Sequence, residues 1–282
     1  MEQTTQQNNP LKQYFRQFKM FLKVPSGTSY YKPDVIEFTD KGEIGILPMT
    51  GQDELILKNP DALLNGEALI EVLRSCVPAV KQPRALLTND IDTLITAIRY
   101  ATYNDSLETN LRCPKCKHEN NFKLDLQYAL DNMTVLDPEY VINLDNGLSV
   151  FVKPYAFPEL LKSLHSEFEQ TKFSRAFENS SLTDEQRSAI FASSFKEISV
   201  TKFELMTSSV VKVVDESQGI NVTEAKFIKE FLQNIDRTAM EKISKLIEEI
   251  NHIGVKRTFT AVCEKCKHEW ESEIDFNPVN FS

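Results

Sequence analysis

Apolar residues recur with helical spacing in two stretches of the first hundred residues. Asn59 precedes Pro60, a favourable first helical residue, and the apolar face that follows predicts a helix reaching Val77. A second stripe predicts another helix, which Thr88 or Asn89 can cap. Its apolar positions are Ile91, Leu94, Ile95 and Ile98.

The second half of the chain has the same periodicity over a longer range. Residues 157–252 are expected to be almost wholly helical, interrupted at 217–219 and ending with a helix near 236–252. Gly254 is the expected stop of that last helix. Two capping boxes are expected to start helices within this range: Thr183 with Gln186, and Thr201 with Glu204.

Alternating apolar and polar residues predict strands elsewhere. Residues 35–48 are expected to form a hairpin that turns at 40–42. Residues 140–153 alternate around Asp-Asn-Gly at 145–147, which is a good hairpin turn. Residues 11–24 fit a helix or a strand, because Tyr14 and Met20 blur the apolar stripe that Phe15, Phe18, Phe21 and Leu22 form.

Composition narrows the class of protein. The chain has 282 residues, 41% of them apolar and 26% charged, which is typical of a globular protein. No apolar run approaches the ~18 residues of a membrane span. The formal net charge of −9 weighs against nucleic acid and anionic membranes as general partners. Residues 1–10 are polar and are expected to form a disordered tail.

The five cysteines carry the clearest chemical signal. Two C-x-x-C pairs lie in matching segments, CPKCKHENNFKLDL and CEKCKHEWESEIDF, and Cys76 stands alone among apolar neighbours. An odd count with this spacing fits metal binding in a reducing compartment better than a secreted disulfide framework. Cys76 is expected to be an inert core thiol.

The two pairs together supply the four thiolates of a tetrahedral site. We expect one structural Zn²⁺ bound by Cys113, Cys116, Cys263 and Cys266, in a zinc ribbon split by a long insertion. A closed Cys₄ shell leaves no position for water, so this zinc would not be catalytic. The sequence leaves open a mixed shell with His118 or His268, two separate zincs, and a redox dithiol.

Other motifs argue against an enzyme and allow two kinds of contact. The chain has no Walker A, G-x-G-x-x-G, G-x-S-x-G or H-E-x-x-H motif. Phe276 and Phe281 near the C-terminus suggest a protein-docking tail. Nearby lysines raise the alternative of a nucleic-acid-binding zinc ribbon, although acidic neighbours offset them: Lys115, Lys117, Lys123, Lys265 and Lys267.

Several segments together resemble a known family. They are NPLKQYFRQ, KVPSGTSYY, LPMTGQDELILKNPDALLNGEALIEVLRSCVP, and IDTLITAIRYATYND running into the first C-x-x-C. In this order they resemble the baseplate hub or baseplate assembly proteins of T-even-type contractile-tailed bacteriophages. The resemblance covers roughly residues 8–130 well and the final thirty residues moderately, while 155–250 match nothing quotable.

The resemblance implies a structural or assembly role at the tail baseplate, without enzymatic activity. The partners it implies are other tail baseplate or hub proteins in a multimeric assembly. The implied location is the host cytoplasm during assembly, with the baseplate of the virion as the second location. Membranes are not expected as partners, and nucleic acid is not favoured.

The expected architecture is α+β: β-hairpins and split Cys₄ knuckles with a largely helical insertion. Residues 11–154 and 255–282 would form one mixed domain around the zinc site. Residues 155–254 would form the helical insertion.

Overall fold

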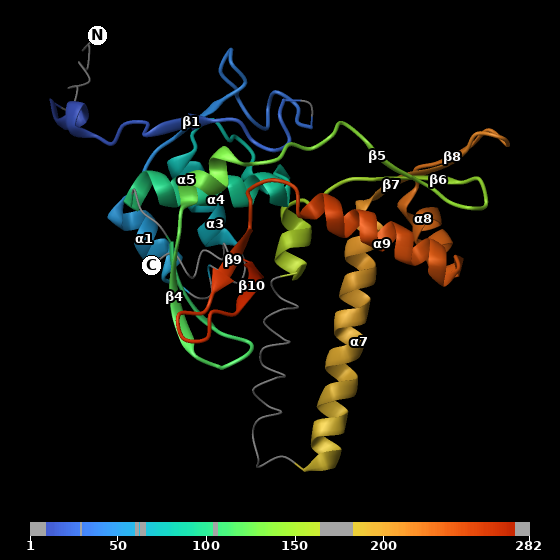
Figure 1. Ribbon diagram of the computed structural model, residues 1–282. Helices are drawn as coiled ribbons and strands as arrows, with labels where there is room; N and C mark the ends of the chain where they lie inside the picture. The colour runs from blue at the N-terminus through green and yellow to red at the C-terminus, as the bar shows by residue number, and fades with distance from the viewer. Residues whose placement is uncertain are drawn as a thin grey trace, which may run out of the picture.

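Helices and short antiparallel hairpins make up the protein, which confirms the α+β class (Figure 1). The computed structural model describes residues 10–28, 30–59, 62, 66–103, 107–163 and 183–273. Positions 1–9 of the tail predicted at 1–10, and the docking phenylalanines Phe276 and Phe281, lie outside these residues. Pro10, the last residue of the predicted tail, instead begins the short 3₁₀ helix η1 (Pro10–Tyr14), whose residues are all exposed.

Helix α4, Thr88–Tyr103, is central to the N-terminal part of the fold. The four apolar positions of its predicted stripe are all buried, and so are most residues on its other sides, because neighbouring elements surround the helix. This part of the fold also contains β1 (Met20–Leu22), β2 (Ile44–Ile46), α1 (Gly51–Leu57), α3 (Glu67–Cys76), η2 (Pro83–Ala85) and α5 (Leu126–Asp131). Cys76 is fully buried here, and desolvation raises the pKa of its thiol to about 12.

A four-stranded antiparallel sheet forms the second centre of packing. Its order is β5 (Tyr140–Asn143), β6 (Ser149–Val152), β7 (Val210–Asp215) and β8 (Ile220–Val222). Helices α8 (Ala225–Asn234) and α9 (Arg237–Asn251) bury apolar residues against it, with the end of α7 (Asp184–Ser209). Figure 1 shows that the rest of α7 extends away from both centres of packing.

Several local predictions hold. The predicted hairpin at 140–153 forms, with Gly147 at φ 85° in its turn. The Thr183–Gln186 capping box forms at the start of α7. The last helix is α9, and its buried residues include the predicted Ile243, Ile247 and Ile250.

Other local predictions are wrong, and each failure has a physical reason. The turn at 39–42 forms, but β2 pairs with β1 and not with residues 35–39, because the backbone around Ile36 bonds instead to the segment around Val80. Thr201 does not start a helix, since it lies inside α7. Residues 210–222 form β7 and β8 where a helix was expected, because β-branched residues there complete the sheet begun by β6.

Of the helix expected from Asn59 to Val77, the structure describes α3, which begins only after Gly66, while positions 60, 61 and 63–65 lie outside the described residues. Gly66 has a φ of +76° and is the N-cap of α3. A Cβ at this position would lie 2.5 Å from Leu161 Cδ2 and 2.9 Å from Phe157 Cζ. Only glycine fits both this backbone conformation and this close approach.

Buried side chains form two clusters. The first joins the helices around α4 with Phe157 and Val255. The second draws residues from both sides of position 154, since β5 and β6 pack with β7, α8 and α9. The division into 11–154 with 255–282, and 155–254, stays a prediction. Among the described residues no helix is long and apolar enough to cross a membrane.

Candidate metal centre

Two antiparallel hairpins position the four cysteines. The first consists of β3 (Leu107–Arg112) and β4 (Glu119–Leu124), with Cys113 and Cys116 in its turn. The second consists of β9 (Thr258–Val262) and β10 (Glu269–Glu273), with Cys263 and Cys266 in its turn. The two hairpins lie side by side, although about 150 residues of sequence separate them (Figure 1).

The two turns have the same backbone geometry. The N–H of Cys113 donates to the carbonyl of His118, and the N–H of Lys117 donates to the carbonyl of Cys113, both at 2.9 Å. The second turn repeats both bonds at 2.9 Å, from Cys263 to His268 and from Lys267 to Cys263. Lys117 and Lys267 have φ values of 60° and 58°, the left-handed conformation that closes each turn. The matched sequences therefore fold into matched knuckles.

The four sulfurs converge between the knuckles. Cys113 Sγ lies 3.7 Å from Cys266 Sγ, and Cys116 Sγ lies 3.6 Å from Cys263 Sγ. All four sulfurs lie within 4.8 Å of one another. None forms a disulfide, whose sulfurs would be only about 2.05 Å apart. The thiols therefore form one cluster that combines both pairs.

This spacing fits a tetrahedral metal ion. Four sulfurs at about 2.3 Å from a central Zn²⁺ would lie about 3.8 Å from one another. The two closest contacts across the knuckles, 3.6 and 3.7 Å, are close to that value. Thiolates are the ligands that closed structural zinc sites prefer. The four cysteines can thus hold a metal ion, and the group contains neither His118 nor His268.

Hydrogen bonds from the turns act on the sulfurs. Desolvation raises the pKa of Cys263, but the backbone N–H groups of Cys266 and Lys265 donate to its sulfur, and its pKa falls to about 6. The pKa of Cys266 rises to about 12: the N–H of His268 lowers it, while desolvation and the neighbouring thiols raise it more. The knuckle N–H groups are therefore aimed at the sulfurs, as a thiolate site requires.

The hairpins also contact each other away from the sulfurs. Asn120 is buried; its Nδ2 donates to the His118 carbonyl and its Oδ1 accepts from the Glu264 N–H, both at 2.9 Å. Phe122 lies between Phe259 and Trp270, with ring centroids 5.7 and 5.9 Å away. A side-chain clip and an aromatic cluster therefore hold the knuckles together beside the thiols.

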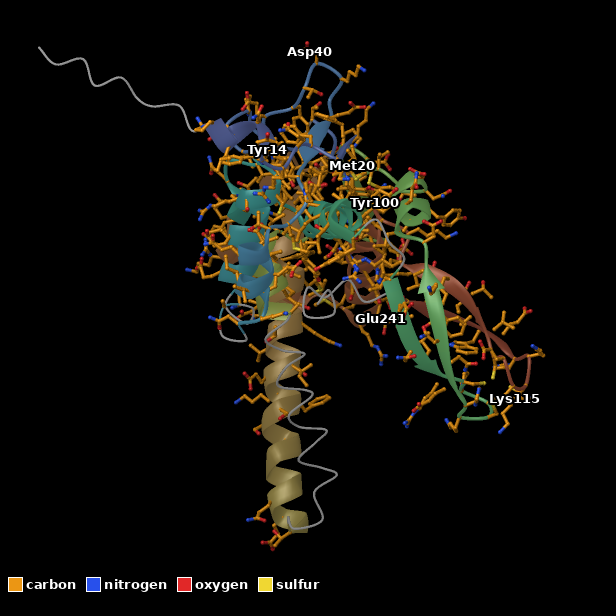
Figure 2. The ribbon with its side chains drawn as sticks, turned by 90° about the vertical axis from the view of Figure 1, so that its left-hand side faces the viewer. Tyr14, Met20, Asp40, Tyr100, Lys115 and Glu241 are labelled. Atoms are coloured by element: carbon orange, nitrogen blue, oxygen red, sulfur yellow. The ribbon has the colours of Figure 1, made fainter. Side chains whose placement is uncertain are left out.

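The surrounding charges divide into two groups. Cross-strand ion pairs neutralise the first hairpin: Arg112 with Glu119 at 2.7 Å, and Lys123 with Glu108 at 3.3 Å. The lysines at the knuckle tips are exposed, and none has an ion pair with a described residue: Lys115, Lys117, Lys265 and Lys267. Lys115 lies at the end of the hairpin, away from the helices (Figure 2).

The structure brings together every predicted metal ligand, and it adds residues that the sequence analysis missed. Asn120 carries no sequence signal, because its partner Glu264 is 144 residues away. The aromatic contact did have a signal: Phe122 and Trp270 each follow a C-x-x-C pair at similar distance.

The hairpins, the helices and the convergent thiols define an α+β protein with a candidate four-cysteine metal centre. A family model described as T4 bacteriophage base plate protein matches residues 16–281. The chain therefore belongs to this family of phage base plate proteins. Comparisons with curated proteins and with solved structures return no match.

Proposed function

We propose that this protein is a structural or assembly component of the hub region of a phage contractile-tail baseplate, with one structural Zn²⁺ at its Cys₄ centre. The observation that carries the metal assignment is the convergence of four sulfurs from two matched knuckles within 4.8 Å. The family match over residues 16–281 supports the baseplate role. Both observations support a role through protein–protein contacts, without enzymatic activity.

Zn²⁺ is the metal that suits this donor set. Soft thiolates select zinc or iron–sulfur clusters, and a tetrahedral S₄ group built from two knuckles is the ligand set of a zinc ribbon. Such a site contributes on the order of 10 kcal/mol to folding when the ligands are unstructured without metal. Here it would fasten the C-terminal hairpin to the middle of the chain, because each knuckle supplies only two ligands.

The shared site is tested by replacing one ligand and watching the other knuckle. Cys263→Ser should speed amide hydrogen exchange in the first hairpin around Cys113 as well as in the second. His118→Ala and His268→Ala are the controls, and both should keep the metal. Faster exchange confined to the second hairpin would contradict a shared ion.

The hub role is tested by association with other tail proteins. The protein should co-purify with baseplate components when expressed with a phage tail gene cluster, in the host cytoplasm during assembly or in finished tails. Antibody labelling of purified virions would separate a permanent component from an assembly factor. A chain that purifies free of every tail protein would contradict the proposal.

The exposed knuckle lysines support a second candidate, a nucleic-acid-binding zinc ribbon. Lys115, Lys117, Lys265 and Lys267 extend from the tips of both turns, where no described carboxylate pairs with them. Binding to DNA or RNA that weakens with salt, and that is lost when these lysines become alanine, would support this candidate. The acidic net charge of −9 makes it the weaker of the two.

A further inference from the structure

We infer that copies of this protein associate head to tail, with the outer face of β1 in one copy docking on the outer face of β10 in the next. The two surfaces are an arm face, formed by Phe18, Lys19, Phe21 and Lys23, and a glutamate face, formed by Glu269, Glu271 and Glu273. The inference goes beyond the proposed function and does not depend on it.

The arm face is apolar, basic and exposed. Phe18 and Phe21 are 49% and 51% exposed, and their rings contact each other with centroids 5.5 Å apart. Lys19 and Lys23 are exposed on the side of the strand that carries Phe21, while Met20 and Leu22 point inward. A pair of phenylalanines held this far out of the core is typical of a surface that a partner covers.

The backbone below the arm face is fixed. β1 pairs with the buried strand β2, and the Phe18 and Phe21 rings lie over Gly45, where a Cβ would be within 3.0 Å of both. Arg16 fastens the preceding residues, since its guanidinium donates to the Pro48 and Ser75 carbonyls and pairs with Asp53 at 3.2 Å. The arm face is therefore presented in one conformation before a partner arrives, which lowers the entropic cost of binding.

The arm segment has a charge opposite to that of the chain. Every charged residue between positions 10 and 33 is basic, in a chain with a net charge of −9, so the rest of the chain is more acidic still. Neither Lys19 nor Lys23 has an ion pair with a described residue. The partner that fits this surface carries carboxylates.

The glutamate face of the same chain carries such carboxylates. Glu269, Glu271 and Glu273 are exposed at alternate positions of β10, so they lie on one side of the strand. Their cross-strand neighbours are Val262, Thr260 and Thr258, none of which is a cation. The first hairpin instead neutralises its glutamates with Arg112 and Lys123. The second hairpin thus leaves a row of carboxylates without a counter-charge among the described residues.

The two faces match in spacing and in chemistry. Lys19 and Lys23 are four residues apart, as are Glu269 and Glu273, and four residues of extended chain span about 13 Å. Val262, 41% exposed beside Glu269, offers apolar contact to the phenylalanines. Opposite charges around an apolar centre give an interface its register.

The contact must join different copies. Figure 1 shows β1 above the helices around α4 and β10 below them, and Figure 2 shows Met20 on the opposite side of these helices from Lys115, at the tip of the neighbouring hairpin. A surface that binds a different surface on the next copy makes a head-to-tail contact, which closes into a ring or grows into an open chain. Nucleic acid and anionic membranes share the preference for basic and aromatic residues, but the acidic remainder of the chain repels them.

Charge exchange between the two faces tests the inference on the full-length protein. The wild type should associate with rising concentration in analytical ultracentrifugation, and 0.5 M salt should weaken this association. Lys19→Glu with Lys23→Glu should weaken it at least about tenfold, and so should Glu269→Lys with Glu273→Lys. An equimolar mixture of these two variants should associate again, because each then offers the charge that the other needs.

Association of the mixed variants would separate an effect of charge from an effect of misfolding, because a misfolded variant would not associate in the mixture. The matched control is Lys12→Glu with Lys32→Glu, which changes the same charge outside the arm face and should leave association intact. A monomeric wild type, or a mixture that stays dissociated, would overturn the inference. Binding of oligo-dT or of phosphatidylserine vesicles that Lys19→Glu with Lys23→Glu abolishes, without self-association, would also overturn it.

Discussion

Replacing Asn120 by alanine removes the clip between the two knuckles and leaves all four cysteines in place. The side chain donates to the His118 carbonyl and accepts from the Glu264 N–H, each at 2.9 Å and with the amide buried. Each lost hydrogen bond costs about 1 kcal/mol, and the Glu264 N–H loses its partner. We therefore expect a loss of about 2 kcal/mol, which for a domain above 150 residues lowers Tm by about 4–8 °C.

The single tryptophan makes this loss visible at the site itself. Trp270 lies on β10 and contacts Phe122 of the first hairpin at 5.9 Å, so its fluorescence follows separation of the hairpins. Thermal unfolding should be followed by tryptophan fluorescence for the wild type, Asn120→Ala and the exposed neighbour Asn121→Ala. The control should change stability by less than about 0.5 kcal/mol. Equal Tm values for the three proteins would refute the role of the clip.

Two further predictions concern the N-terminal core. Gly66→Ala should lower stability by more than about 2 kcal/mol in thermal unfolding, because the new Cβ would lie 2.5 Å from a Leu161 carbon at a φ of +76°; Gly51→Ala, which meets no atom within 4 Å, is the control. Desolvation raises the pKa of Asp53, but hydrogen bonds from Thr50 and Ser75 and the charge of Arg16 lower it overall to below 3.8. A lowered folded-state pKa stabilises the fold above the unfolded pKa of about 3.9, and this stabilisation is lost as pH falls through the folded value. Urea unfolding should therefore show Asp53→Asn less stable than wild type at pH 7, with a gap that narrows toward pH 3; a gap independent of pH would contradict the assignment.

Local signals explain which elements the sequence could predict. The buried stripe of α4, the Thr183 cap and the turn at Gly147 each depend on residues only a few positions apart. Elements of this kind can be predicted from the sequence because residues close together in the chain determine them. The cysteine centre was predictable for a different reason: four matched thiols have few other chemical uses.

Long-range pairing explains the failures. The strand β2 prefers β1, more than twenty residues earlier, over the adjacent residues that the hairpin pattern indicated. The sequence VVKVVD of β7 carries a β-branched signal, but the helical pattern on both sides obscured it, and its partner β6 lies some sixty residues upstream. Asn120 could not be recognised at all, since only the folded chain brings Glu264 to it.

The metal content of the purified protein tests the central claim most directly. Protein purified without chelator should contain one zinc per chain, and X-ray absorption at the zinc edge should show four sulfur ligands at about 2.3 Å. This result follows from four sulfurs within 4.8 Å of one another, contributed in pairs by two knuckles. Two zincs per chain, no metal, or a first shell with nitrogen in place of a Cys113, Cys116, Cys263 or Cys266 sulfur would contradict the shared Cys₄ site.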